Sequence, residues 1–226
     1  MLKKLLRHNE SYLFILIFLI SIIITIANPD FLTFENILGF LKSYSMIGIM
    51  AVGTLFVLIL GGTPDVSFTA IAQVVEYAIA VIILAIGGNI FFAILMACIM
   101  GMIMGILNGL IIHYFKVTTI IVTIATFNIY YGLMYVITEG KLINVVHEMF
   151  ENFGNTLIFP TTTEIGGAYG LTLMPILWFG SLLLGWFILR KTFLGRSIFA
   201  MGGNEIAAER VGINLMFVRV FVFGFV

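Results

Sequence analysis

Long apolar segments without charge are the feature that most constrains what this chain can fold into. Residues 90–115, IFFAILMACIMGMIMGILNGLIIHYF, contain no lysine, arginine, aspartate or glutamate from end to end. A helix needs about 20 mainly apolar residues to cross the hydrocarbon core of a bilayer. The pattern predicts an all-α fold, a polytopic transmembrane helical bundle with six full spans. The six predicted spans are residues 11–27, 45–61, 67–86, 90–115, 118–138 and 170–189.

The overall composition supports a lipid environment. Of the 226 residues, 62% are hydrophobic and 10% are charged, whereas a soluble domain carries roughly 25% charged residues. Such a chain has too little polar surface to cover itself in water, so its solvent is lipid. With no long linker and no obvious internal repeat, we expect residues 1–226 to form a single transmembrane domain. A seventh apolar segment begins near Phe217 and reaches Val226, so we expect the start of a seventh span and a C-terminal truncation.

Charge and motif content exclude several classes of function. The net charge is zero, which argues against a nucleic-acid partner. The lone cysteine, Cys98, supports neither a disulfide framework nor a metal cluster, and the three histidines are scattered along the chain. The sequence contains no H-E-x-x-H, no G-x-S-x-G and no P-loop. We therefore expect no enzyme, no metal site and no P-loop binding of ATP on this chain.

The distribution of basic residues predicts the orientation in the membrane. With a cytoplasmic N-terminus, nine of the eleven lysines and arginines fall on the inner side, and only Lys42 and Lys141 fall outside. Lys3, Lys4 and Arg7 precede the first apolar segment, which we interpret as an uncleaved first helix. A cleaved signal peptide is the alternative. The prediction is a multi-pass protein of the cell membrane.

The stretch GGTPDVSF, residues 61–68, interrupts two apolar segments. The paired glycines and Pro64 break a helix, and Asp65 and Ser67 are suited to cap the helix that follows. One interpretation is a tight inner turn with an N-cap. The other is a broken helix whose exposed backbone groups line a cavity, as substrate sites in transporters often do.

Two polar side chains lie inside the third predicted span. Glu76 is near mid-depth, and Gln73 lies three residues before it on the same face of the helix. A carboxyl at this depth costs several kcal/mol unless it is protonated, paired or hydrated. Glu76 is therefore either a neutral side chain hydrogen-bonded between helices or part of a face that lines a translocation path.

The fourth predicted span contains three glycines spaced four residues apart, Gly101, Gly105 and Gly109. This double G-x-x-x-G pattern forms a smooth groove that another helix backbone can approach closely, within the chain or across a dimer. Two further polar regions stay open. The threonines of residues 118–138 serve as interhelical hydrogen-bonding groups or as pore lining, and residues 139–169 form a plain outer loop or a cap for an extracytoplasmic partner.

The segment FLGRSIFAMGGNEIAAERVGINLMFVR, residues 193–219, is unusually polar for this chain. The Gly202–Gly203 pair is expected to break the chain, and Asn204 to cap a short helix, EIAAERV, that ends at Gly212. Ala207 and Ala208 give that helix a small surface suited to docking in a groove of another protein. An ordinary basic inner loop that obeys the positive-inside rule is the alternative.

The inner segment resembles the cytoplasmic loop of the ribose/autoinducer-2 type family of ABC transporter permeases, in the branched-chain-amino-acid-like permease superfamily. LGRSIFAMGGNEIAAERVGIN is similar to the family pattern FGR-x-I-x-A-x-GGN-x-x-A-A-x-x-x-GI. GGTPDVSFTAIA resembles the family's GGIDLSVG, and NGLIIHYFKVTTIIVTIATFNIYYGLMYVITEGK resembles another family stretch. The chain departs from the pattern at Leu194, usually Phe, at the extra residue of Thr63-Pro64, and at Thr69, usually Gly.

The resemblance implies a permease subunit of an ATP-driven importer for a sugar or sugar-like solute. ATP would be held by a partner ABC ATPase, with no cofactor on this chain. The other implied partners are a second permease chain, identical or different, and an extracytoplasmic solute-binding protein. Residues 193–214 would be the ATPase-coupling loop, with coupling residues Gly203, Asn204, Glu205, Ala207, Ala208 and Gly212. We assign the substrate path to Asp65, Ser67, Gln73 and Glu76.

Two hypotheses from other classes compete with this one. The first is a proton-linked secondary transporter in which Glu76 carries the proton. The second is a membrane-embedded enzyme or assembly scaffold, which requires a cluster of polar catalytic groups at one depth. The sequence has no such cluster.

Overall fold

The computed structural model describes residues 9–141, 143, 147–162 and 168–226. The chain divides into two compact units, the first made of Met1–Tyr44 and Leu157–Thr172 and the second of Ser45–Thr156 and Leu173–Val226. The helix α3 (Phe34–Gly61) contributes to both units.

Within the described residues, five helices are long and apolar enough to cross a membrane. They are α3 (Phe34–Gly61), α4 (Phe68–Ile86), α5 (Ile90–Phe115), α6 (Thr119–Thr138) and α8 (Leu173–Lys191). Two shorter apolar helices are Ser11–Ala27 in α2 (Asn9–Ala27) and α11 (Leu215–Phe225). The helical, polytopic class is thus confirmed, whereas the count of six full spans and a seventh stays a prediction.

The first unit contains α2, a 3-10 helix η1 (Pro29–Leu32), the start of α3 and a β-hairpin. Asn28 turns the chain between α2 and η1 by accepting a hydrogen bond from the backbone N–H of Asp30 at 3.1 Å. The antiparallel strands β1 (Leu157–Thr162) and β2 (Ala168–Thr172) form the hairpin. The fold is therefore not purely α-helical, because β-branched and aromatic residues in these two segments favour an extended pair.

The hairpin and a short helix replace the plain loop that was one expectation for residues 139–169. The helix α7 (Glu148–Asn155) belongs to the second unit, and His147 caps it by accepting from the backbone N–H of Met149 at 3.2 Å. Because β2 ends at Thr172, α8 begins at Leu173 and not at the predicted residue 170.

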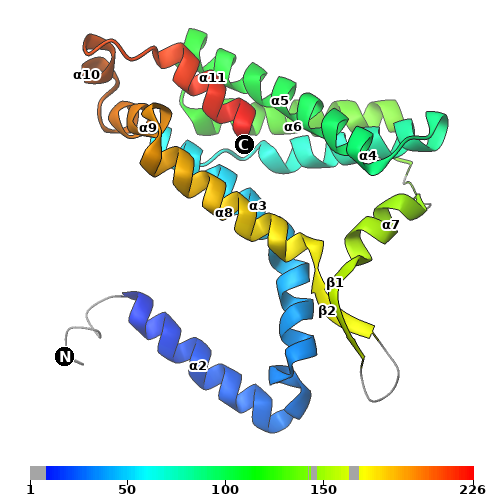
Figure 1. Cartoon of the computed structure of the whole chain (residues 1–226). Coiled ribbons are helices and arrows are strands. Elements are labelled where there is room, and N and C mark those ends of the chain that lie inside the picture. The colour runs from blue at the N-terminus through cyan, green and yellow to red at the C-terminus, as the bar shows by residue number, and fades with distance from the viewer. Residues whose placement is uncertain (1–8, 142, 144–146, 163–167) are drawn as a thin grey trace. The chain divides into compact units, whose positions relative to one another are not determined.

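The core of the second unit joins the end of α3 to the C-terminal helices (Figure 1). Phe56 of α3 packs in one cluster with Ile198 of α9 (Phe193–Gly203), Ala208 of α10 (Glu205–Arg210) and Val222 of α11. A second cluster lies between α4 and α5, centred on Val75, Ile79 and Ile83 with Ala93.

The helices α5 and α11 approach each other through glycine (Figure 1). A Cβ atom at Gly105 would overlap the carbonyl oxygen of Phe223, and one at Gly109 would lie 3.1 Å from the Cα of Val220. The backbones therefore meet directly, as a G-x-x-x-G groove allows. Gly101 is different, because a Cβ atom there meets nothing within 4 Å.

Candidate functional site

The stretch between α3 and α4, residues 62–67, lies against α5 and α6. The Nδ2 of Asn108 on α5 donates to the Oγ of Ser67 at 2.7 Å, and the backbone N–H of Val66 donates to the Oγ1 of Thr123 on α6 at 3.2 Å. Asn108 is about two helical turns, or ~10 Å, before the end of α5 at Phe115. The stretch thus enters the bundle, as in a broken helix, and is not a turn at its end.

Asp65 organises the start of α4. Its Oδ1 accepts hydrogen bonds from both the backbone N–H and the Oγ of Ser67, each at 2.6 Å. Both Asp65 and Ser67 are buried, but Ser67 makes no side-chain capping bond of its own. The capping predicted for the pair therefore comes from Asp65 alone. The Oδ1 of Asn108 is buried and has no hydrogen-bond partner among the described residues.

Asp65 also lines a cavity of about 520 Å³. The lining is otherwise almost entirely apolar and comes from four helices, α3, α4, α5 and α11. Gly101, where an added Cβ atom would meet nothing within 4 Å, lines the same cavity. A concave apolar cavity with few polar groups is the usual form of a small-molecule site, because the polar groups orient the ligand.

Gln73 and Glu76 do not join this cluster. Both are exposed on α4, whereas Val75 and Ile79 on the same helix are buried. The structure therefore separates the four residues of the predicted substrate path into a buried pair, Asp65 with Ser67, and an exposed pair. The separation arises because Ser67 precedes the helix that carries the other two.

The short helix α10 (Glu205–Arg210) forms where the sequence predicts it. Asn204 caps it with its Oδ1, which accepts from the backbone N–H of Ala207 at 3.0 Å. Gly212, with φ +87°, ends the turn in a conformation that favours glycine. The expected break at Gly202–Gly203 was wrong, because α9 continues to Gly203 and the chain turns only at Asn204.

The two alanines of α10 differ in exposure. Ala208 is 2% exposed and belongs to the core, so it anchors the helix and offers no docking surface. Ala207 is exposed, and the neighbouring Ile206 and Val211 are 65% and 76% exposed. The outward surface is therefore apolar, built on Ala207 and these two larger side chains, with Gly203 and Glu205 also exposed beside it.

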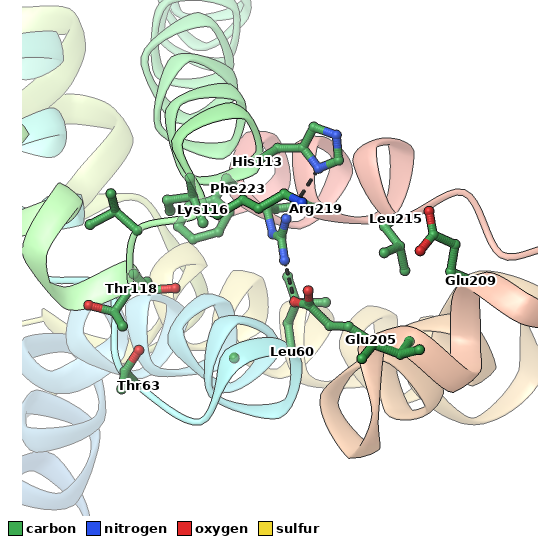
Figure 2. A pocket seen from close by; sticks show the side chains of 15 residues that line it. Leu60, Thr63, His113, Lys116, Thr118, Glu205, Glu209, Leu215, Arg219 and Phe223 are labelled. Atoms are coloured by element: carbon green, nitrogen blue, oxygen red, sulfur yellow. Dashed lines mark hydrogen bonds and ion pairs between the residues drawn. The ribbon is translucent and has the colours of Figure 1, made fainter.

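Arg219 of α11 holds α10 to the end of α5 (Figure 2). One guanidinium nitrogen forms an ion pair with Glu205, and another lies 3.2 Å from the Nδ1 of His113. Because arginine has only donors, the Nδ1 of His113 is the acceptor. From the sequence, Arg219 was predicted only as one of the basic residues on the inner side. The signal for its role was a single arginine in an otherwise apolar helix.

The contacts of Arg219 with Glu205 and His113 form a junction, the Arg219 junction. It borders a second cavity, of about 510 Å³ (Figure 2). Its lining mixes apolar side chains with polar ones, and the charged or titratable members are His113, Lys116, Glu205, Glu209 and Arg219. No group of three His, Cys, Asp or Glu side chains within the described part of the chain is arranged to hold a metal ion.

Five apolar helices, a non-helical stretch inside the bundle and a short capped helix at its end define a polytopic membrane protein of the transporter type. Residues 36–226 match the family model described as branched-chain amino acid transport system / permease component, so the chain belongs to this permease family. The expected resemblance is thereby confirmed. The family consists of transport components, which agrees with the expectation that the chain is not an enzyme.

Several relatives are sugar permeases by name. The chain is 33% identical to the ribose import permease protein RbsC of Haemophilus influenzae over 216 residues, 95% of this chain and 64% of the relative. It is 35% identical to that of Bacillus subtilis over 212 residues, 93% and 62%. It is 34% identical to the L-arabinose transport system permease protein AraH of Escherichia coli over 195 residues, 86% and 56%.

The chain thus spans less than two thirds of the length of these relatives. No solved structure matches it.

Proposed function

We propose that this chain forms the membrane path of an ABC importer for a sugar or sugar-like solute. The family and the names of its relatives support a transport role, and sugars are the solutes in those names. ATP is hydrolysed by a separate ATPase subunit, and an extracytoplasmic binding protein delivers the solute. The N-terminus and α10 lie on the cytoplasmic side, as the positive-inside rule favours.

The helix α10 is the observation that carries this proposal. It is capped at Asn204, anchored by the buried Ala208 and tied by Glu205 to Arg219, so it is held rigidly on its inner side. Its outer side presents Ile206 and Ala207 to a partner. A short rigid helix with an exposed apolar face fits a groove of another protein, and we assign this groove to the ATPase.

Asp65 forms the polar wall of the substrate path, and the buried Ser67 supports it through a hydrogen bond. The Asp65 carboxylate is the acceptor that the cavity of about 520 Å³ offers to a ligand hydroxyl. Sugars carry many hydroxyl donors, and a buried site built to bind them rejects ligands that lack them.

The exposed pair on α4 supports a second permease chain. Gln73 and Glu76 lie within a span, and a carboxyl that faces lipid at this depth costs several kcal/mol. Cover by a second permease chain at this face removes that cost. We therefore propose a dimer of permeases, of identical or paired chains, with Gln73 and Glu76 at the contact.

Co-purification with an ABC ATPase subunit from the same organism tests the proposal. Ala207→Trp places a large side chain on the outer surface of α10 and is expected to weaken ATPase association at least about tenfold, as at a central interface position. Ala168→Trp, at an exposed alanine of β2, is the matched control and is expected to leave association unchanged. Equal association of both variants with the ATPase would refute the assignment of α10.

A further inference from the structure

Arg219 connects three elements that are far apart in the sequence. It lies on α11, pairs with Glu205 at the start of α10 and donates to His113 near the end of α5 (Figure 2). Its side chain is only 11% exposed, whereas that of Glu205 is 49% exposed. The arginine is thus enclosed between a surface helix and the spanning bundle, where its ion pair is less screened than one at an open surface.

The helices α5 and α11, which carry His113 and Arg219, are in backbone contact. Gly105 and Gly109 of α5 lie against the backbone of Phe223 and Val220 of α11, with no side chain between them. Contact of this kind leaves little room for sliding, because packed interiors are not continuously deformable. A displacement that reaches Arg219 therefore moves α5 and α11 together.

The helix α5 leads from the junction to the buried polar cluster. Asn108 lies five residues before His113, on the same helix, and donates to Ser67, which in turn donates to Asp65. Every link between Glu205 and the cavity lined by Asp65 is thus a hydrogen bond, an ion pair or a rigid helix segment.

We infer that Arg219 is the positioning residue that transmits displacement of α10 to α5 and, through Asn108, to the cavity at Asp65. Another route from α10 runs through α9, where Gly202 lies against the carbonyl of Ile59 at the end of α3. Ala208 also packs in the core cluster that contains Val222 of α11. The Arg219 route is the polar one, and it ends at His113 on α5. The role of this link in transport rests on the proposed function, whereas the mechanical link between α10 and α5 does not.

The charged residues near Arg219 determine which control variants the test needs. Lys116 at the end of α5 and Glu209 on α10 line the same cavity as Arg219. Glu209 is the carboxylate that is available to replace Glu205, so the test includes the double variant Glu205→Gln/Glu209→Gln. Arg196 on α9 is an exposed arginine over the ring of Phe193, and Arg196→Gln removes the same charge outside the junction.

The first experiment measures the link in the full chain, in lipid nanodiscs and without an ATPase. Spin labels replace the exposed residues Ile206 on α10 and Tyr114 on α5, in a Cys98→Ser background. Pulsed electron paramagnetic resonance is expected to give a narrow distribution of the distance between the two labels. This distribution is expected to broaden in Arg219→Gln and in the double variant Glu205→Gln/Glu209→Gln. Arg219→Lys is expected to restore part of the narrow component, and Arg196→Gln to leave it unchanged. A distribution that is the same in Arg219→Gln and the unmutated chain would overturn the inference.

The second experiment measures coupling in the complete transporter with its ATPase in proteoliposomes. Arg219→Gln is expected to lower the solute transported per ATP hydrolysed by about threefold, as for the loss of one coupling between contacting residues. Assembly with the ATPase should be unchanged, because Arg219 is not on the outer surface of α10. An unchanged coupling ratio would overturn the transmission role. Failure of the unmutated chain to bind any ATPase would instead refute the proposed function and leave the first experiment standing.

Discussion

Replacing Gly105 by alanine tests whether α5 and α11 meet through their backbones. A Cβ atom at this position would overlap the carbonyl oxygen of Phe223, whereas at Gly101, one turn earlier on the same helix, it meets nothing within 4 Å. Both substitutions add one methyl group to the same helix, so the difference between them isolates the contact with α11.

The expected magnitude follows from two opposing effects. Alanine in place of glycine within a helix gains about 1 kcal/mol, and both variants share this gain. Overpacking costs about 1–3 kcal/mol, and the obstacle at Gly105 is a backbone carbonyl that cannot rotate aside. Gly105→Ala should therefore be about 2–3 kcal/mol less stable than Gly101→Ala, which should match or exceed the unmutated chain.

Thermal unfolding of the purified full chain in one detergent measures this difference. For a chain of this size 1 kcal/mol corresponds to a shift in Tm of about 2–4 °C, so the variants should differ by about 4–12 °C. A Gly105→Ala variant that unfolds at the same temperature as Gly101→Ala would refute the close backbone contact and, with it, the rigid pairing of α5 and α11.

Three further predictions address the site. Asp65→Asn preserves shape but removes the charged acceptor, so solute uptake into vesicles should fall about tenfold or more, with ATPase association unchanged as measured by co-purification. Glu76→Gln should leave ATP-driven uptake within about twofold of that of the unmutated chain, because Glu76 is outside the Asp65 cavity. Uptake that is driven by a pH gradient and abolished by this change would instead favour a proton-linked transporter. Asn204→Ala removes the cap of α10 at a cost of about 1 kcal/mol, and faster hydrogen exchange at the amide of Ala207 should report it; unchanged exchange would contradict the capping role.

Local structure was largely predictable from the sequence because lipid and caps leave strong local signals. The predicted span 90–115 coincides with α5, and the predicted span 118–138 differs from α6 by one residue. Asn204 and Gly212 bound α10 closely, since a capping side chain and a positive φ act over a few residues. The start of α3 at Phe34 was missed, because the first eleven residues include Glu35, Asn36 and Lys42 and dilute the apolar pattern.

The arrangement of the site was less predictable because it depends on contacts between distant residues. Nothing local in the sequence distinguishes Ala207 from Ala208, yet one is exposed and the other is in the core. The partnership of Asn108 with Ser67 joins residues 41 apart, and that of Arg219 with His113 joins residues 106 apart. Helical periodicity indicates which residues share a face, but it does not say which face the neighbouring helices cover.

The hydrogen bonds of residues 62–67 also have a consequence for the order in which the chain assembles in the membrane. This stretch carries Asp65 and free backbone groups, which lipid alone cannot satisfy and which cost several kcal/mol when left bare. Its partners, Asn108 and Thr123, are encoded later in the chain. The stretch between α3 and α4 therefore completes its hydrogen bonds only after the ribosome has supplied both partners, so the full set forms once synthesis has passed Thr123.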